Sequence, residues 1–287
     1  MPELPEVETV ARNLAPKIVG KTCGSLIVSD IKLGNPPQNF KNYLINDVSR
    51  LGKEVLFQFS KNSKELYLLV HLRMSGRLLF NQGNSFEELE ASDSYLEHKI
   101  IRIKSDNFSK HIRATFKFKD SELYFFDVRR FGTFKWHTKR PTLPEGTVDP
   151  VNKNFDFETF TELANKSKNL SVKNFLLRQD RISGIGNIYA SEIAFSSRIR
   201  PTRIVGTLSK PELKKLFKSI PSILNKAILN NGTTFSDFQL DDSSTGNYQN
   251  FLKVYGKTNE NCKICKTPIS KIVQNQRSTF FCPQCQR

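Results

Sequence analysis

The first nine residues of the chain contain a group that can act as a nucleophile. These residues are Met1-Pro2-Glu3-Leu4-Pro5-Glu6-Val7-Glu8-Thr9. Removal of Met1, which a small residue such as Pro2 permits, leaves a secondary amine at the N-terminus. An α-amino group titrates at about 7.7 to 8.0, so part of it is unprotonated at neutral pH and can attack an aldehyde-like carbon. Glu3 and Glu6 are near enough in the chain to transfer protons for it. The alternative is an ordinary start to a first amphipathic helix.

Four of the five cysteines form two Cys-x-x-Cys pairs, Cys262/Cys265 and Cys282/Cys285, separated by 16 residues. This spacing predicts one tetrahedral Zn²⁺ site. Two disulfides are the alternative, which a reducing intracellular setting disfavours. Residues 270–274 and 278–281 are expected to form two strands, with Arg277 in the turn that joins them. The fifth cysteine, Cys23, is expected to be a small buried or turn residue.

Three further side chains follow or begin predicted strands. Lys53 comes after Gly52 at the entry to a strand, where a lysine can reach a phosphate. His71 and Met74 come just after the apolar run 67–70. Each also has an ordinary interpretation: a surface lysine, a structural histidine and a methionine that fills the core.

The segment Asp127-Val128-Arg129-Arg130-Phe131-Gly132 places two arginines and an aromatic residue beside a glycine. Such a loop can push an aromatic ring and a guanidinium into a stack of bases. The alternative is a hairpin loop in which one arginine pairs with Asp127.

Two glycines at 184 and 186 interrupt a helical region, and Asn187 follows them. Glycines let backbone amides come close to another molecule, and Asn187 can begin a helix whose N-terminus attracts phosphate. A helix, a glycine turn and a second helix form only a weak signature of DNA binding.

The elements expected to hold these groups fall into two kinds. The N-terminal half shows many short strands with no helix between them, which favours an antiparallel sandwich after one first helix. Helical spacing dominates beyond a proline-rich stretch at 136–152, and Ser209 with Glu212 has the spacing of a capping box. The predicted strands are 25–31, 54–59, 66–72, 77–80, 100–103, 114–119 and 123–127, and the predicted helices are 156–166, 171–178, 187–197 and one from 210 toward Asn230.

The charge of the chain favours a nucleic-acid partner. The formal net charge is +16 over 287 residues, and residues 153–287 carry 21 basic and 10 acidic side chains. No basic amphipathic segment and no apolar run of membrane length is present, and the N-terminus lacks a signal pattern. We therefore expect an intracellular protein that binds nucleic acid and no membrane.

Read as a whole, the sequence resembles the bacterial formamidopyrimidine-DNA glycosylase (8-oxoguanine DNA glycosylase) family, which shares its fold with endonuclease VIII. Four stretches carry the resemblance: residues 2–9, His71-Leu72-Arg73-Met74-Ser75-Gly76-Arg77, Gly184-Ile185-Gly186-Asn187-Ile188-Tyr189 and the cysteine module. Leu4 favours this branch over endonuclease VIII, which typically has glycine there.

The resemblance implies an activity and roles for particular residues. Members flip a damaged base out of duplex DNA, attack the sugar with the proline amine and cut the strand by β,δ-elimination through a Schiff base. It implies an N-terminal proline nucleophile at Pro2, proton transfer by Glu3 with support from Glu6, and catalytic assistance from Lys53. It also implies phosphate contacts by His71, Asn187 and Arg277, and a wedge of Met74, Arg129 and Phe131 that fills the gap left by the flipped base.

The resemblance implies an α+β protein with four parts. These are an N-terminal catalytic β-sandwich domain with a flanking helix (1–135), a linker (136–152), a helical helix-two-turns-helix domain (153–250) and a zinc-finger β-hairpin with four cysteine ligands (251–287). The implied partner is double-stranded DNA containing oxidised bases or abasic sites, bound by a monomer in the cytoplasm at the nucleoid. Two alternatives stay open: an endonuclease VIII-like enzyme for oxidised pyrimidines, and a non-catalytic zinc-ribbon reader of damaged DNA.

Three stretches depart from the family pattern. Arg73 stands where a small residue is more frequent, residues 177–182 add charge before the glycine turn, and the lesion-capping loop 235–250 matches only at its ends. Lesion preference is therefore the feature that the sequence specifies least.

Overall fold

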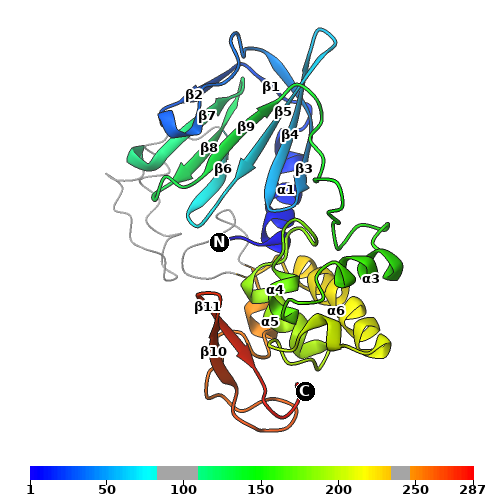
Figure 1. Ribbon diagram of the computed structural model, residues 1–287. Coiled ribbons are helices and arrows are strands. Elements are labelled where there is room, and N and C mark those ends of the chain that lie inside the picture. The colour runs from blue at the N-terminus through cyan, green and yellow to red at the C-terminus, as the bar shows by residue number, and fades with distance from the viewer. Residues whose placement is uncertain (83–108, 234–245) are drawn as a thin grey trace. The chain divides into compact units, whose positions relative to one another are not determined.

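A computed structural model of the chain describes residues 1–82, 109–233 and 246–287 (Figure 1). The strand expected at 100–103 and most of the loop 235–250 lie outside these residues. Two compact units are present. The described residues of the first are 1–2, 6–82, 109–142, 233 and 246, and the second comprises Glu3–Pro5, Leu143–Gly232 and Asn247–Arg287.

The first unit is a sandwich of two antiparallel sheets with helix α1 (Leu4–Ile18) beside them (Figure 1). One sheet has the strand order β1-β3-β4-β5-β9 and the other β2-β7-β8-β6. The strands are β1 (Thr22–Cys23), β2 (Ser25–Val28), β3 (Tyr43–Leu51), β4 (Glu54–Lys61), β5 (Lys64–His71), β6 (Gly76–Gln82), β7 (Ile112–Lys117), β8 (Ser121–Asp127) and β9 (Thr133–His137). The predicted antiparallel sandwich is confirmed.

Alternating side chains explain why these strands stack. Val55, Phe57 and Phe59 of β4 point into the core with Phe116 of β7, while Leu56 belongs to a small cluster on the other face. Phe57 and Phe116 stack with their ring centroids 5.8 Å apart. A period of two side chains is what a strand buried on one face requires. The buried rings set the distance between the two sheets, and the loops of the first unit project from the edges of this sandwich.

Three strands of the first unit were not predicted: the two-residue strand β1, and the longer strands β3 and β9. In β3 the register shifts between Ile45 and Asp47, so the apolar alternation that identifies a strand is interrupted. β9 contains Lys135, and it follows directly after the Arg-Arg-Phe loop, so the sequence does not show where the loop ends and the strand starts. Its pairing with β5, Val70 opposite Phe134, gives it a buried position that the local pattern does not reveal.

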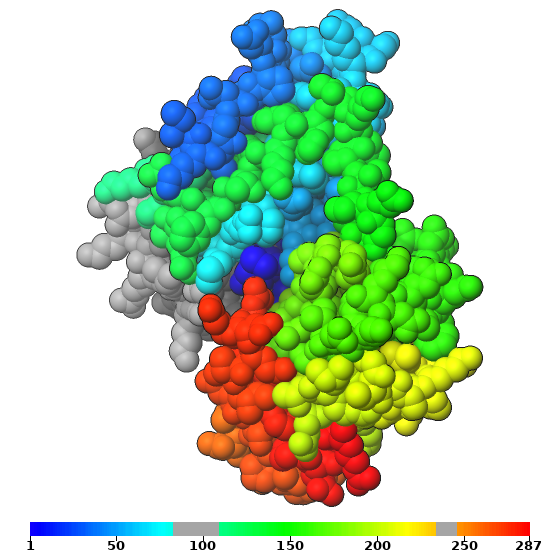
Figure 2. Space-filling model, viewed as in Figure 1, coloured from blue at the N-terminus to red at the C-terminus, as the bar shows by residue number. Residues whose placement is uncertain are grey.

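The second unit is helical and contains α3 (Phe157–Asn165), α4 (Val172–Leu176), α5 (Asn187–Ser196) and α6 (Lys210–Leu229). Helix α5 is buried from Ile188 to Phe195, so it is enclosed by the elements around it. The predicted capping box is present, since the backbone N–H of Ser209 donates to the Glu212 carboxylate at 2.8 Å. One side of α6, the yellow segment in Figure 2, lies at the surface and carries exposed lysines.

The C-terminal module continues the second unit. Strands β10 (Ser270–Gln274) and β11 (Arg277–Phe281) form the expected hairpin. Arg277 was expected in the turn, but it pairs with Gln274 as the first residue of β11, so that the turn has only two residues. The module shares a small core with α5, in which Phe195 meets Val254 and Phe280. Among the described residues, none of the helices is long and apolar enough to cross a bilayer.

Candidate active site

Glu3 is fixed by the start of helix α5. Its carboxylate accepts hydrogen bonds from the backbone N–H groups of Gly186 (2.8 Å), Ile188 (2.9 Å) and Tyr189 (3.3 Å), and its side chain is buried. A carboxylate at a helix N-terminus also gains from the helix dipole. Pro2, its neighbour in the chain, is buried as well. The sequence thus places a secondary amine, once Met1 is removed, next to an immobilised carboxylate.

The glycine turn before α5 is shaped by residues at the chain's own start. A Cβ on Gly186 would lie 2.2 Å from Cδ of Glu3, and Gly184 has a φ of +92° with the Leu4 side chain 2.7 Å from where its Cβ would be. We expected these glycines to bring amides close to another molecule. In the structure three amides of this turn and helix bind Glu3, which takes the place expected for a phosphate.

Glu6 fixes a different segment. One carboxylate oxygen accepts from the N–H (2.8 Å) and the hydroxyl (2.9 Å) of Thr233, and both residues are buried. Thr233 is the last described residue before the stretch 234–245. Glu6 therefore anchors the entry to that stretch. Nothing in the sequence pattern had indicated Thr233 as its partner.

Lys53 lies in the tight turn between β3 and β4, where Gly52 has a φ of +61°. The turn is tied to α1, because Arg50 donates to Glu8 at 2.8 Å and to the carbonyl oxygen of Gly52 at 3.0 Å. Arg12 donates to the same carboxylate at 2.7 Å. Burial alone would raise the pKa of Glu8, but the two guanidinium groups outweigh it and lower the pKa. Glu8 and Arg50 were not singled out from the sequence, although Glu8 belongs to the N-terminal motif.

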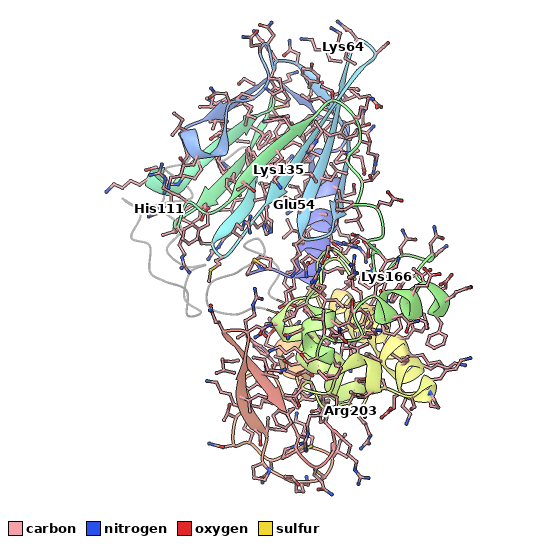
Figure 3. The ribbon with its side chains drawn as sticks, viewed as in Figure 1. Glu54, Lys64, His111, Lys135, Lys166 and Arg203 are labelled. Carbon is pink, nitrogen blue, oxygen red and sulfur yellow. The ribbon has the colours of Figure 1, made fainter. Side chains whose placement is uncertain are left out.

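His71 ends β5 and is neutral at physiological pH. Burial, followed by the charges of Arg73, Lys53 and Lys135, lowers its pKa to about 4. Its Nδ1 accepts the backbone N–H of Arg73 at 3.0 Å, so the ring proton is on Nε2, which can donate to an anion. Lys135 itself pairs with Glu54 at 3.5 Å across the sheet (Figure 3).

The proposed wedge residues come from two loops of the first unit. Phe131 is 51% exposed, and the Arg129 guanidinium lies 5.1 Å from the centre of its ring. Met74 is partly buried in the turn that precedes β6. The structure thus brings Arg129 and Phe131 together as one exposed cation–π pair.

The two arginines of this loop differ in their partners. Arg130 donates twice to Asp30, at 2.6 and 2.8 Å, and this hydrogen bonding lowers the pKa of Asp30 to about 2. Asp127 accepts instead from the backbone N–H groups of Arg129 and Gly132. The expected alternative of an ion pair between an arginine and Asp127 is therefore wrong for this loop, because the acid that holds an arginine comes from residue 30.

In the second unit Arg277 begins strand β11, next to a buried lysine. Lys173 of α4 is fully buried, and its ammonium donates to the Ser278 carbonyl at 2.9 Å and the Thr279 hydroxyl at 2.6 Å. Burial, then the charge of Arg277, lowers its pKa to about 8, although Glu3 opposes this shift. The Asn187 side-chain amide donates to the same carbonyl of Ser278 at 3.0 Å. Sequence reasoning missed Lys173, whose only signal was a lysine among apolar helix positions.

The four paired cysteines form a metal site. Their sulfur atoms all lie within 4.8 Å of one another, with 3.9 Å between Cys262 and Cys285 and 3.4 Å between Cys265 and Cys282. A tetrahedral Zn²⁺ with bonds of about 2.3 Å holds sulfur atoms about 3.8 Å apart, so this set fits the ion. None of the four forms a disulfide. The predicted zinc ligands are thus gathered at one point.

Comparison with known proteins decides the family. The model of the formamidopyrimidine-DNA glycosylase N-terminal domain matches residues 1–134, that of the H2TH domain of the same family matches 147–239, and a zinc finger found in FPG and IleRS matches 259–287. A formamidopyrimidine-DNA glycosylase of Mycoplasma genitalium is 37% identical over 298 residues, covering 100% of this chain and 96% of the relative. This chain belongs to the formamidopyrimidine-DNA glycosylase family.

Other members of the formamidopyrimidine-DNA glycosylase family agree with this assignment. A relative of the same name from Listeria monocytogenes is 36% identical, with 100% of each chain covered. Lactococcus lactis Fpg, solved with DNA containing an abasic site, has a TM-score of 0.82 at 32% identity and covers 99% of both chains. MutM, solved with DNA containing carbocyclic 8-oxo-G, has a TM-score of 0.81 at 32% identity and covers 100% of both chains. The family resemblance, the fold class and the zinc finger predicted from the sequence are confirmed.

Proposed function

We propose that this protein is a bifunctional DNA glycosylase of base excision repair, which removes oxidised purines and then cuts the strand as a lyase. Its substrates are 8-oxoguanine and formamidopyrimidines in double-stranded DNA, and abasic sites. The observation that carries the proposal is the buried pair Pro2-Glu3, in which three amides hold the carboxylate next to the proline. The DNA in the two solved relatives supports this substrate class.

Pro2 is the proposed nucleophile. Its unprotonated nitrogen forms a bond to C1′ of the flipped nucleotide, the bond from C1′ to the base breaks, and the departing base takes up a proton. A secondary amine cannot give a neutral imine, so the ring-opened sugar stays attached as a positively charged iminium ion. The proton that the amine loses passes to the sugar ring oxygen as the ring opens. The cation then withdraws electrons, so that a proton leaves C2′ as the 3′ phosphate departs (β-elimination), and a proton leaves C4′ as the 5′ phosphate departs (δ-elimination).

Glu3 is the proposed proton-transfer group. Because three backbone amides fix its carboxylate, the side chain is already oriented when it exchanges a proton with the sugar or the base. The same negative charge stabilises the iminium cation on Pro2. Glu6 supports the site through Thr233.

Four residues are proposed to hold the DNA backbone. Lys53 and Arg277 offer cations, and Lys53 also assists proton transfer. His71 offers the N–H of a neutral ring, and Asn187 offers its side-chain amide. Contacts to the phosphates, charged or neutral, position a duplex without reading its sequence. The zinc site supports this role for Arg277, because a metal-bound module limits the movement of the hairpin that carries it.

Met74, Arg129 and Phe131 are proposed to fill the space that a flipped base leaves. Flipping costs a few kcal/mol of stacking and pairing, which inserted side chains offset. The exposed cation–π pair of Arg129 and Phe131 supports this role, because the guanidinium holds the ring whose face can stack on a base.

The proposal extends to organisation and location. Residues 1–135 form the catalytic domain, 136–152 the linker, 153–250 the helical DNA-binding domain and 251–287 the zinc finger. The protein acts as a monomer in the cytoplasm, at the nucleoid where its DNA substrate lies.

One alternative has an observation in its favour. Wild-type Lactococcus lactis Fpg, 32% identical with a TM-score of 0.81, has also been solved with DNA containing an oxidised pyrimidine. The competing function is therefore the same chemistry on oxidised pyrimidines. A non-catalytic reader of damaged DNA is the remaining candidate.

Borohydride trapping tests all three. Tag-free protein, with Met1 removal checked by intact mass, is mixed with end-labelled duplexes containing 8-oxoguanine opposite cytosine, thymine glycol or an abasic site. We expect a covalent band with 8-oxoguanine and with the abasic site. A variant with one alanine inserted between Met1 and Pro2 converts the proline nitrogen into an amide. It should give no band with 8-oxoguanine and no crosslink to Pro2 on any duplex, while still binding an abasic analogue.

The other outcomes separate the alternatives. A band with thymine glycol that exceeds the band with 8-oxoguanine would assign the protein to oxidised pyrimidines. Binding of every duplex with no band, even on the abasic site, would leave the non-catalytic reader. A wild-type crosslink that peptide mapping places on a residue other than Pro2 would exclude Pro2 as the nucleophile.

A further inference from the structure

The two loops that carry the proposed wedge leave the same end of one pair of strands. In the antiparallel pair β6 and β8, Gly76 lies opposite Asp127. Met74 precedes Gly76 by two positions, and Arg129 and Phe131 follow Asp127 by two and four. The strand register therefore brings together two segments that lie about fifty residues apart in the chain. In an extended chain the same two segments would be many ångströms apart.

The Asp127 carboxylate connects these two loops. Its Oδ1 accepts from the Ser75 hydroxyl at 2.5 Å and from the Arg129 backbone N–H at 3.2 Å. Its Oδ2 accepts from the Gly132 backbone N–H at 2.7 Å. The Arg129 N–H is shared with the Ser75 hydroxyl oxygen at 3.2 Å. One carboxylate, only 1% exposed, thus bonds the residue after Met74 and both ends of the loop that holds Phe131.

Packing of apolar side chains does little to keep this loop in its shape. Val128 and Phe131 are 42% and 51% exposed, so burial of apolar side chains fixes neither. The closing residue, Gly132, is tightly placed, since a Cβ there would lie 2.4 Å from the Phe125 ring and 3.1 Å from Asp127. Hydrogen bonds at the buried base of the loop must therefore set where its tip points.

Arg130 adds a second attachment beside the first. Its backbone is left-handed, with a φ of +56°, and its guanidinium is held by the buried carboxylate of Asp30. This leaves Arg129 as the arginine on the side of Phe131, where its guanidinium lies over the ring. Asp30 thus binds Arg130 and leaves the Arg129 guanidinium beside Phe131, while Asp127 holds the backbone of Arg129 in place.

We propose that Asp127 is a positioning residue that locks the Met74 turn and the Arg129–Phe131 loop into one rigid wedge, so that both loops enter the duplex together. This inference rests on the proposed function, because it assigns a support to residues that are themselves proposed to enter DNA. Asp127 touches no reacting atom, and acts through the two loops that it joins.

Replacing Asp127 by asparagine tests the idea with little change in volume. An amide has one oxygen, so its NH₂ group must face either the Gly132 N–H or the donors from Ser75 and Arg129. Two donors then oppose each other, and at least one hydrogen bond to a charged acceptor is lost. We expect base release from an 8-oxoguanine duplex to slow by about 10-fold to 100-fold in single turnover.

Two readouts separate positioning from damage to the whole protein. A 2-aminopurine placed beside the lesion reports unstacking when the wedge enters the duplex, and Asp127→Asn should reduce that signal. A single-stranded abasic oligonucleotide has no opposite strand and no gap to fill, so its cleavage should stay within about two-fold of wild type. Asp120→Asn is the matched control, because Asp120 lies at the other end of β8, is 62% exposed and bonds Lys21.

A second pair of variants keeps the test decisive if Asp127→Asn does not fold. Ser75→Ala removes only the link to the Met74 turn and should slow duplex excision by about three-fold to ten-fold, with single-strand cleavage unchanged. Phe131→Ala should slow duplex excision by itself. When Phe131→Ala is combined with Ser75→Ala or Asp127→Asn, the effects should be far from additive, because both act through one wedge.

The outcomes distinguish the inference from the function on which it rests. If Phe131→Ala lowers duplex excision while both Asp127→Asn and Ser75→Ala match Asp120→Asn, Asp127 does not position the wedge. The same conclusion follows if their effects simply add to that of Phe131→Ala, or if single-strand cleavage falls equally. If Phe131→Ala changes neither excision nor 2-aminopurine fluorescence, the wedge itself is refuted, and absence of the covalent trap with wild type refutes the glycosylase.

Discussion

Replacing Gly186 by alanine should disable the active site without altering any residue proposed to react. Gly186 has φ −123° and ψ −160°, an extended conformation that alanine adopts without strain. The added Cβ, however, would lie 2.2 Å from Cδ and 2.4 Å from Oε1 of Glu3. The substitution therefore acts on Glu3 through space.

The size of the effect follows from this overlap. Nonbonded carbon atoms prefer separations of about 3.5–4.0 Å, so the carboxylate must move by more than about 1 Å or α5 must shift away. A displacement of that size in a reacting group can cost about 100-fold in rate. Weakened hydrogen bonds to a charged acceptor cost about 1.5–3 kcal/mol each, so we expect unfolding free energy to fall by about 2–4 kcal/mol.

The assay combines single-turnover excision of 8-oxoguanine with urea unfolding. Gly24→Ala is the matched control, because its Cβ would have only the Lys117 carbonyl oxygen nearby, at 3.6 Å. Glu3→Ala removes the overlapping atoms, so adding Gly186→Ala to it should cost little further stability. The reasoning fails if Gly186→Ala excises like Gly24→Ala, or if it destabilises the Glu3→Ala background as much as wild type.

Three further predictions concern the metal, pH and the buried lysine. Cys285→Ser should reduce bound zinc below one ion per chain and make residues 251–287 sensitive to protease, and full zinc retention in a metal-release assay would contradict the four-cysteine site. For His71, a folded pKa of about 4 against an ordinary 6.5 means that the unfolded chain binds the proton first, so unfolding free energy should fall by about 2 kcal/mol between pH 6.5 and 5. His71→Gln should lose that part of the pH dependence. If the unfolding free energy measured with urea changes with pH equally in both proteins, His71 is not the cause. For Lys173, a folded pKa of about 8 against 10.5 means that stability should rise as the pH increases from 8 toward 10.5. That rise should be absent in Lys173→Met and present in Lys166→Met, an exposed control, when both are followed by urea unfolding.

Local signals in the sequence identified much of the fold. The pairs Cys262/Cys265 and Cys282/Cys285 predict zinc because two ligands three positions apart on each side already approximate half of a tetrahedron. The capping box at Ser209 and Glu212 located the start of α6, since that motif is closed within a single turn. Strand β3 was missed because its register shift breaks the alternation on which strand prediction depends.

Sequence reasoning placed the proposed nucleophile but could not find its support. Pro2 and Glu3 are neighbours in the chain, so their association needs no folding to recognise. The partners of Glu3 are amides at Gly186, Ile188 and Tyr189, more than 180 positions away, and they carry no side-chain signature because a backbone N–H is the same in every residue but proline. The glycine turn therefore resembled a phosphate site until the structure showed what it binds.

The sequence by itself determined the chemistry available to this protein: a terminal secondary amine beside a carboxylate, four thiolates for one metal, and an excess of positive charge. These depend on residue types and short spacings, which survive in any conformation. Only the tertiary structure decided which of two adjacent arginines is held by Asp30, that Lys173 is buried against the strand that Arg277 begins, and that Asp127 joins the Met74 turn to the Phe131 loop. Each of these is a buried polar contact between distant segments, and burial forces such groups to find partners that only the folded chain can bring to them.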